Sequence, residues 1–231
     1  MTSTYSGRIS LSLRIDPTLS DRFPGLTAKI VNLKGVEVRG ESTELETFKA
    51  EVLERVRNNW TLEQLREHST FRAYRDFFWR MGVDPTKNRP AAEALIRRTL
   101  HGNPIPMINT LVDSYNLASI ESTVAIAAFD EDKLKGDLYM RQAEREEEFM
   151  GIGMGKPALL SGGEVVVTDD DRLVAVYPYR DADFSKVTEQ TKNVVFLICG
   201  VPNITAETLK YAGKVTVEYV TRFCDGTSGD R

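Results

Sequence analysis

Six short apolar segments follow one another after residue 103, and they limit the possible folds more than any other feature of the chain. Each is rich in β-branched or aromatic residues and is bounded by Gly, Asp, Asn or Pro, a pattern typical of strands. The segments are 122–130, 137–143, 164–170, 172–179, 193–201 and 213–220. The second half of the chain is therefore predicted to be mostly sheet.

The first half combines two strands with helices. Residues 8–16 alternate apolar and polar side chains, and a second strand is expected within 26–38, ending near Gly35 or Gly40. Apolar residues at intervals of three and four predict helices, with Ser42 or Thr43 capping the first of them. The helical segments are 44–60, 62–82, 90–102 and 204–213, while 108–120 reads as a short helix or irregular segment and 224–231 as a fraying tail.

This order of elements predicts an α+β fold in which sheet stacks on sheet and helices cover one side. We expect N-terminal strands and a helix in 1–60, packed on a main domain of 61–231, as a single compact unit overall. No apolar run reaches the roughly 18 residues that span a bilayer, and no signal-peptide core is visible. Cys199 and Cys224 lack CxxC spacing, so a cytoplasmic protein without disulfides or zinc is expected.

Charge is distributed unevenly along the chain, whose formal net charge is −4. Residues 66–100 carry eight basic and four acidic side chains, whereas 121–150 carry four basic and nine acidic ones. Helix capping explains Pro90 and Gly102, but a helix dipole disfavours cations such as Lys87 and Arg89 near the amino end. The excess predicts a basic face for a polyanion; a solvated charged face is the simpler alternative.

Several kinds of catalytic machinery are missing from the sequence. His68 and His101 are the two histidines, and neither stands in a metal-binding or triad pattern. No GxSxG motif occurs, and the glycine-rich residues 151–157 lack the spacing of a phosphate loop and fit a hairpin connection better. No metal or cofactor is therefore expected. Any chemistry must use positioned water with Asn, Asp, Thr, Arg or Glu side chains.

Five pieces in a fixed order resemble a known module. They are INTLVDSYNL (108–117), AAFDEDKLKGDLYMRQAEREEEF (127–149), GGEVVVTDDDRLVAV (162–176) and VTEQTKNVVF (187–196), with two motifs in the second piece. Together they resemble the editing module of the phenylalanyl-tRNA synthetase β subunit over about residues 70–200. The segment YRDFFWRMGVDPTKNRPAAEALIRR resembles the lead-in of free-standing, B3/B4-type editing-domain proteins, which lack the other synthetase modules.

The resemblance implies a three-layer β/β/α fold with stacked mixed sheets, helices on one side, and a pocket for the acylated acceptor end of tRNA. It also implies hydrolysis of a mischarged aminoacyl ester, a second sieve that is needed because one pocket separates near-isosteric side chains poorly. Two departures affect the pocket. Ala127 stands where the synthetase has a histidine, and 177–186 replaces its glycine-rich segment. Tyrosine specificity is therefore not expected to carry over.

The resemblance also assigns candidate site residues. Those matched to catalytic elements are Asp113, Asn116, Arg180, Asp181, Thr188 and Thr191; those matched to substrate contacts are Asn109, Ala127 and Tyr179. The candidate tRNA-binding residues are Arg75, Arg80, Lys87, Arg89, Arg97 and Arg98. Each has a structural alternative: Asp113, Asn116 and the threonines as caps, Arg180 and Asp181 as a surface ion pair. Asp130 reads as a structural turn residue, and nearby aromatics such as Trp79 read as core.

Two functions follow from these observations. The first is a trans-acting deacylase that binds the acceptor end of tRNA and clears mischarged amino acids. The second is a non-catalytic module of the same fold that holds tRNA or an amino-acid-like ligand, favoured by Ala127 and the net acidic charge. A partner-binding protein with a vestigial pocket is a third reading. Neither DNA nor a membrane is expected as a partner, and the sequence does not fix the oligomeric state.

Overall fold

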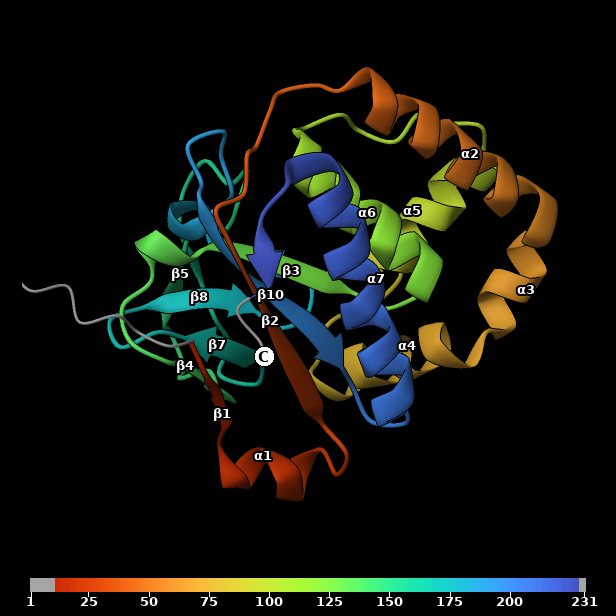
Figure 1. The fold of residues 1–231 in the computed structure, drawn as a ribbon. Helices are drawn as coiled ribbons and strands as arrows, with labels where there is room; N and C mark the ends of the chain where they lie inside the picture. Colours follow the sequence, from red (N-terminus) through yellow and green to blue (C-terminus); the bar gives the residue numbers. More distant parts are fainter. Residues whose placement is uncertain (1–10, 229–231) are drawn as a thin grey trace, which may run out of the picture.

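A four-stranded antiparallel sheet forms the middle layer of the protein. The computed structural model describes residues 11–228. The sheet contains β2 (Thr27–Lys34), β3 (Ile126–Asp130), β10 (Asn193–Gly200) and β11 (Thr227–Ser228), in the order β11-β2-β10-β3. Figure 1 shows β2 and β10 crossing the centre of the molecule side by side. In this sheet β3 is an edge strand, with β10 as its neighbour.

A five-stranded mixed sheet forms the second layer. Its order is β1-β4-β7-β8-β9, with β1 parallel to β4 and the other pairs antiparallel. Its strands are β1 (Leu13–Ile15), β4 (Leu138–Gln142), β7 (Val165–Thr168), β8 (Leu173–Val176) and β9 (Arg180–Asp181). A separate pair, β5 (Glu148–Phe149) with β6 (Ala158–Leu159), and two 3-10 turns, η1 (Glu131–Lys133) and η2 (Asp183–Ser185), lie along its connections.

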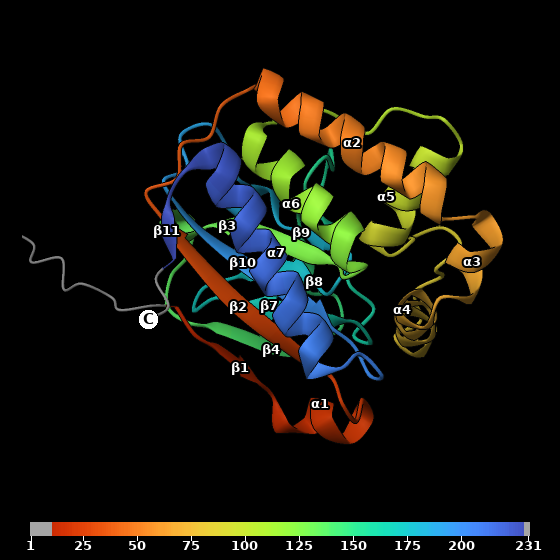
Figure 2. The ribbon, with the colours of Figure 1, turned by 45° about the vertical axis from the view of Figure 1, so that its right-hand side comes forward.

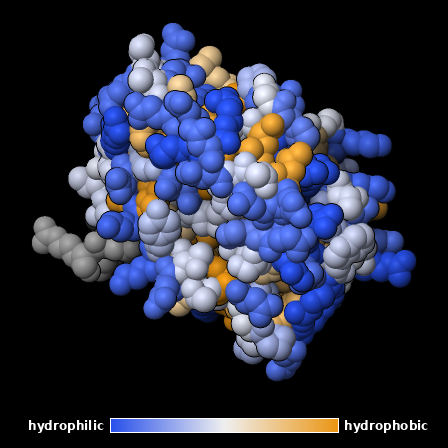
Figure 3. Space-filling view, turned by 90° about the vertical axis from the view of Figure 1, so that its right-hand side faces the viewer, coloured by the Kyte–Doolittle hydropathy of each residue, from blue (hydrophilic) through white to orange (hydrophobic). Residues whose placement is uncertain are grey.

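Helices form the third layer. They are α2 (Thr43–Asn59), α3 (Leu62–Glu67), α4 (Ser69–Arg80), α5 (Ala91–Leu100), α6 (Thr110–Ser122) and α7 (Ala206–Cys224). The short helix α1 (Pro17–Arg22) lies apart from them and contacts β4 of the five-stranded sheet (Figure 1). Figures 1 and 2 show α6 and α7 side by side on the four-stranded sheet, with α2 and α5 outside them. The predicted α+β fold of stacked sheets with helices on one side is confirmed. The face that carries α2 and α3 is mainly hydrophilic, with small apolar patches (Figure 3).

Strand β10 explains why this sheet lies at the centre. Its sequence NVVFLICG is apolar at almost every position, and Val194 through Gly200 are buried. A strand covered by other layers on both faces needs apolar side chains in both directions, unlike a half-exposed strand. β10 pairs with β2 along its whole length and with β3 from Val194 to Ile198.

The segment 213–220 is helical, which makes the predicted strand there wrong. Helix α7 begins at the Thr205 cap, which accepts a hydrogen bond from the Thr208 N–H at 3.1 Å, and continues to Cys224. Its buried residues recur at helical intervals, among them Leu209, Ala212, Thr216 and Val220. Gly213 does not end the helix because it faces the sheet, where an added Cβ would lie 3.4 Å from Val31. Packing on the sheet thus outweighs the β propensity of the valines.

Other boundaries differ from prediction in smaller ways. The expected helix 62–82 is two helices, α3 and α4, joined by an extended His68 whose ring contacts Trp60 and Phe71. Segment 108–120 contains the regular helix α6, and the tail forms β11 on β2 instead of fraying through Ser228. Residues 8–10 of the first strand and residues 229–231 of the tail lie outside the described residues. The separation of 1–60 from 61–231 stays a prediction.

Two buried tyrosines tie α4 and the second sheet to the middle layer. The Tyr74 hydroxyl on α4 donates to the Cys199 carbonyl and accepts the Ala125 N–H at 3.0 Å. The Tyr177 hydroxyl, after β8, lies 3.0 Å from the Thr27 carbonyl and 2.8 Å from that of Gly200. Burial raises the pKa of both phenols well above the usual value, so both are neutral donors.

We predict that Tyr74→Phe lowers the free energy of unfolding by roughly 2–3 kcal/mol, because the Cys199 carbonyl and the Ala125 N–H both lose a buried partner. Urea denaturation measures the change. Tyr211→Phe is the matched control, since Tyr211 is 47% exposed and should shift stability by less than about 0.5 kcal/mol. Equal stability of the two variants would contradict the assignment.

Candidate functional site

Strand β9 brings Asp181 to the free edge of β3. Asp181 lies opposite Ala175 of β8, and β9 also contacts β3 of the other sheet. The Cys199 N–H donates to the Ala125 carbonyl at 2.9 Å, and N–H groups alternate in direction along a strand, so the Ala128 N–H points away from β10. This N–H faces the Asp181 carboxylate. The two sheets thus meet around one acidic side chain.

Burial raises the pKa of Asp181 to about 7, against the opposing effects of the Ala128 N–H and the Arg180 charge. Burial first, and then the Asp181 charge, raise the pKa of both Tyr115 on α6 and Cys199 on β10. The carboxyl therefore has a phenol and a thiol nearby that stay neutral at ordinary pH. A half-buried carboxyl that titrates near neutrality can accept a proton from water and return it.

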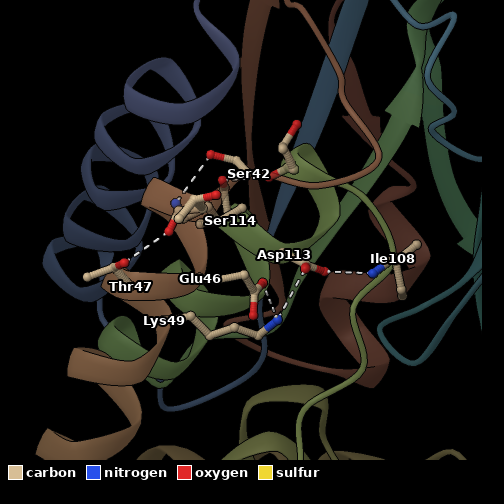
Figure 4. Close-up of polar contacts among 10 residues, drawn as sticks. Ser42, Glu46, Thr47, Lys49, Ile108, Asp113 and Ser114 are labelled. Carbon is tan, nitrogen blue, oxygen red and sulfur yellow. Dashed lines mark hydrogen bonds and ion pairs between the residues drawn. The ribbon is translucent and has the colours of Figure 1, made fainter.

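Asp113, the second predicted carboxylate, is held by other groups. It lies on α6, where its Oδ1 accepts the Ile108 N–H at 3.1 Å and its Oδ2 lies 3.3 Å from the Lys49 ammonium of α2 (Figure 4). Lys49 also pairs with Glu46 at 3.0 Å. Asp113 and Lys49 are buried, and desolvation raises the pKa of Asp113 despite these partners. This ion pair joins α2 to the start of α6.

The other α6 candidates differ in their surroundings. Asn109 is the buried N-cap of α6, and its side chain accepts the Val112 N–H at 2.9 Å, as the capping alternative predicts. Asn116 lies one turn after Asp113 and is half-buried. Ala127 is buried in β3 opposite Leu197, so this position offers an apolar surface without a functional group. The functional roles of these residues stay predictions.

Thr188 and Thr191 form a turn before β10. The Thr191 hydroxyl accepts the Thr188 N–H at 3.0 Å and donates to Asp130 Oδ2 at 2.8 Å. Asp130 also accepts the Asp132 N–H at 3.1 Å at the start of η1, in agreement with the turn role expected for it. Both threonines thus connect the β10 entry to the end of β3. A catalytic role for them would need these hydrogen bonds to be exchanged.

Arg180 lies against the glycine-rich loop 151–157, whereas Tyr179 lies against α4. Arg180 is exposed and donates to the Ile152 carbonyl at 3.2 Å, and an added Cβ at Gly151 would lie 2.5 Å from the Arg180 Cδ. The Tyr179 ring packs on Phe78 of α4, with centroids 5.7 Å apart. The hairpin reading of 151–157 therefore fits, and the loop places the Arg180 guanidinium beside the backbone that carries Asp181.

A cavity of about 330 Å³ lies beside this loop. Its lining includes Phe149, Met150, Arg172, Ala182 and Phe184, and the Arg172 guanidinium stacks over the Phe184 ring at 3.5 Å. The cavity adjoins β9 at Ala182, the residue after Asp181. Its lining is largely apolar, but Ala182 belongs to the apolar cluster with Phe149 and Leu173, whereas Asp181 lies opposite Ala175 of the main core. Because successive side chains of a strand point to opposite faces, the cavity and the Asp181 carboxyl lie on different faces of the five-stranded sheet.

The structure brings three of the six predicted tRNA-binding residues together. Arg75, Arg89 and Arg97 line one cavity of about 540 Å³, together with Arg66, Trp79 and Glu93, which sequence reasoning did not select. The remaining three lie outside its lining: Arg80 donates to the Arg22 carbonyl, Arg98 to the Pro104 carbonyl, and Lys87 is exposed. Trp79 is 58% exposed, so its expected place in the core is wrong.

The spacing of residues on α4 and α5 predicts part of this cavity lining. Arg75 and Trp79 are four residues apart on α4, and Glu93 and Arg97 are four apart on α5, which places each pair on one helix face. Arg89 lies before α5, so this spacing does not place it. Tyr115 and Cys199 had no comparable signal, because their nearness to Asp181 arises from the packing of α6 and β10.

Within residues 11–228, no group of three His, Cys, Asp or Glu side chains is arranged for a metal ion. No helix of that same range is long and apolar enough to cross a membrane.

Comparisons with known proteins agree with the fold. The family profile described as "B3/4 domain" matches residues 73–228. The phenylalanine–tRNA ligase β subunits of Fusobacterium nucleatum and Staphylococcus saprophyticus are 32% and 31% identical over 97 and 107 residues, or 42% and 46% of this chain. The matches span only 12% and 13% of those subunits. A crystal structure of an N-terminal fragment of the phenylalanyl-tRNA synthetase β subunit from Pyrococcus horikoshii superposes with a TM-score of 0.51 at 16% identity, covering 94% of this chain and 50% of that one.

We predict that Asp113→Asn lowers the free energy of unfolding by roughly 3 kcal/mol, because it leaves the buried Lys49 ammonium without its buried counter-ion. Glu46→Gln removes the exposed partner of the same lysine and should cost less than about 1 kcal/mol. Chemical denaturation of both variants tests the difference. A stable Asp113→Asn protein would argue against a structural ion pair.

We also predict a pH-dependent effect of Asp181→Asn on stability. The folded protein holds the Asp181 proton up to about pH 7, whereas the unfolded chain loses it near 3.8, so the wild type loses stability as the pH rises between these values. Relative to the wild type, the variant should gain roughly 2–4 kcal/mol between pH 4 and pH 8, with no further gain above that. Urea titrations at several pH values measure this. Asp183→Asn, two residues away and paired with Lys186, is the control; a pH-independent difference for Asp181→Asn would refute the raised pKa.

Proposed function

Because this chain belongs to the B3/4 domain family, we propose that it binds tRNA and acts in trans as an aminoacyl-tRNA deacylase on mischarged acceptor ends. The observation that supports hydrolysis best is Asp181, a carboxyl with a pKa of about 7 at the meeting of the two sheets. The likeness to phenylalanine–tRNA ligase β subunits supports tRNA as the class of partner.

The geometry supports a simple reaction. Ionised Asp181 takes a proton from a water molecule as its oxygen adds to the ester carbonyl carbon. The Arg180 charge, which already acts on Asp181, also stabilises the negative charge that develops on the carbonyl oxygen. The bond from that carbon to the ribose oxygen then breaks, and protonated Asp181 returns the proton to the ribose. The products are a free amino acid and an uncharged tRNA, and no cofactor is consumed.

An activated ester explains why so few catalytic groups suffice. The acyl ester of tRNA is far more reactive than a peptide, so a positioned water and one base near neutrality can replace a nucleophilic triad. The apolar wall at Ala127 offers a surface for the amino-acid side chain.

A non-catalytic tRNA-binding module is the second candidate. It is favoured by the hydrogen bonds of three predicted catalytic residues: Asp113 is engaged by Lys49, and Thr188 and Thr191 are engaged with each other and with Asp130. In that case the fold would retain the acceptor-end surface while Asp181 served a structural purpose. The two candidates differ in one measurable quantity, the hydrolysis rate.

We predict that the purified protein releases amino acid from at least one member of a panel of mischarged tRNAs, at a rate that rises with pH and levels off above about pH 7. This sign follows because only ionised Asp181 can accept the proton. Asp181→Asn should reduce the rate by about 10²–10⁴-fold and remove the inflection.

Asp171→Asn, which changes an exposed carboxylate that pairs with Lys135, is the control for this assay and should keep the wild-type rate and pH profile. Loss of labelled amino acid from each tRNA, measured against spontaneous hydrolysis, gives the rates. Binding of tRNA without turnover on any member of the panel would favour the non-catalytic module. A normal rate in Asp181→Asn would exclude this carboxyl as the base.

A further inference from the structure

A cavity between three helices lies apart from the residues around Asp181. It has a volume of about 540 Å³, within the roughly 300–1,000 Å³ of typical small-molecule sites. Its lining comes from α3, α4, α5 and the turn before α5, and it includes Arg66, Arg75, Trp79, Arg89, Glu93 and Arg97. The surface on which α3 lies is mainly hydrophilic (Figure 3), so the cavity is not part of a broad apolar docking face.

Glu93 gives the cavity an unsatisfied acceptor. Its side chain is only 7% exposed, and one oxygen, Oε1, pairs with Arg75 Nη1 at 2.9 Å. The other oxygen, Oε2, is buried and has no hydrogen-bond partner among residues 11–228. A buried carboxylate oxygen without a donor is costly, and native proteins rarely leave one so. A ligand that brings an N–H donor into the cavity would satisfy it.

Two arginines give the cavity uncommitted positive charge. The side chains of Arg89 and Arg97 make no hydrogen bond or ion pair with another described residue, whereas Arg75 is paired with Glu93 and Arg66 with Glu67. Arg97 lies one helical turn after Glu93 on α5, while Arg89 lies in the turn before that helix, and both line the cavity. Planar guanidinium groups bind phosphate through paired N–H donors.

Trp79 supplies an exposed aromatic face. Its neighbours Phe77 and Phe78 are buried, but Trp79 is 58% exposed and lines the cavity. An indole offers a large aromatic face on which a nucleobase can stack, because every base has a planar π-face. A large apolar side chain left in solvent beside unpaired arginines is typical of nucleic-acid contacts.

We propose that this cavity binds one nucleotide: its base stacks on Trp79 and donates an N–H to Glu93 Oε2, and its phosphate pairs with Arg89 and Arg97. A stacking face, an acceptor for a base edge and cations for a phosphate are the three parts of a nucleotide site, and all three line this one cavity. The inference deepens the tRNA-binding part of the proposed function and does not depend on hydrolysis.

Helix α4 separates this nucleotide cavity from the Asp181 region. Phe78 packs on Tyr179, two residues before Asp181, while the next residue, Trp79, faces the cavity. Consecutive residues of a helix are about 100° apart around its axis, so a nucleotide in the cavity would lie on a different face of α4 from the face that packs on Tyr179. The cavity is suited to a nucleotide other than the one that carries the amino acid, which must reach the sheet edge.

The test uses the full chain and AMP as the probe, with calorimetric titration as the readout. We expect saturable AMP binding that is at least tenfold tighter than binding of inorganic phosphate. Trp79→Ala should weaken it about 5- to 150-fold, the range found when a stacking partner is removed. Trp79 is exposed, so this variant should fold, and its circular dichroism spectrum verifies that it has.

Two matched comparisons separate the base contact from the phosphate contact. Purine riboside 5′-monophosphate lacks the adenine amine, and it should bind about tenfold more weakly than AMP if Glu93 accepts from that amine. Arg97→Gln should weaken AMP binding at least fivefold, whereas Arg98→Gln, the next residue on the same helix but outside the cavity lining, should not.

Three results would overturn the proposal: AMP binding no better than phosphate, wild-type affinity in Trp79→Ala, or equal effects of Arg97→Gln and Arg98→Gln. A short single-stranded RNA identifies the source of the nucleotide. Tighter binding of the RNA than of AMP, lost in Trp79→Ala, assigns the cavity to an RNA strand, and tighter binding of AMP assigns it to a free nucleotide. Because neither arm measures ester hydrolysis, failure of the deacylase assay leaves this test intact.

Discussion

The burial of β10 on both faces and along both edges is the constraint from which the rest of the architecture follows. A strand of eight residues with almost no polar side chain must be covered by helices on one side and by a second sheet on the other. Its backbone groups are paired by β2 and β3. Once β10 is enclosed in this way, β3 becomes an edge strand, and its outward N–H groups need partners from another part of the chain.

The Asp181 site is a consequence of that edge. Strand β9 reaches β3 from the second sheet and presents a carboxylate to the Ala128 N–H. The same enclosure that stabilises the fold removes water from this carboxyl, which raises its pKa to about 7. Asp113 shows the contrast: its charge is compensated by Lys49 and by the Ile108 N–H, and it joins two helices. The buried Asp113 and the half-buried Asp181 thus have different chemistry because their neighbours differ.

The sequence predicted the fold class because the evidence for it is local. Neighbouring residues are enough to identify these features: the apolar run 193–201, the Ser42 and Thr205 helix caps, and the helix end at Gly82. Residues 213–220 were mistaken for a strand because alternating valines imitate strand periodicity, and only contact with Val31 shows why a glycine-containing helix lies there. Likewise, Arg180 and Asp181 were selected by motif position, but the nearness of Tyr115 and Cys199 depends on long-range packing. The functional assignment of these residues stays a prediction.

The anchoring of α4 by Tyr74 has a consequence for molecular recognition. If the helix slid or rotated on the sheet, the Cys199 carbonyl and the Ala125 N–H would both lose their hydrogen bonds to Tyr74 and remain buried without a partner. Trp79 lies just over one turn further along this helix. The position of its backbone is therefore fixed before a ligand binds. A surface fixed in this way loses little conformational entropy when a ligand binds. It therefore discriminates between ligands by their shape and does not adapt to each one. The surface around Trp79 would then be preorganised and would accept only ligands that fit its existing shape.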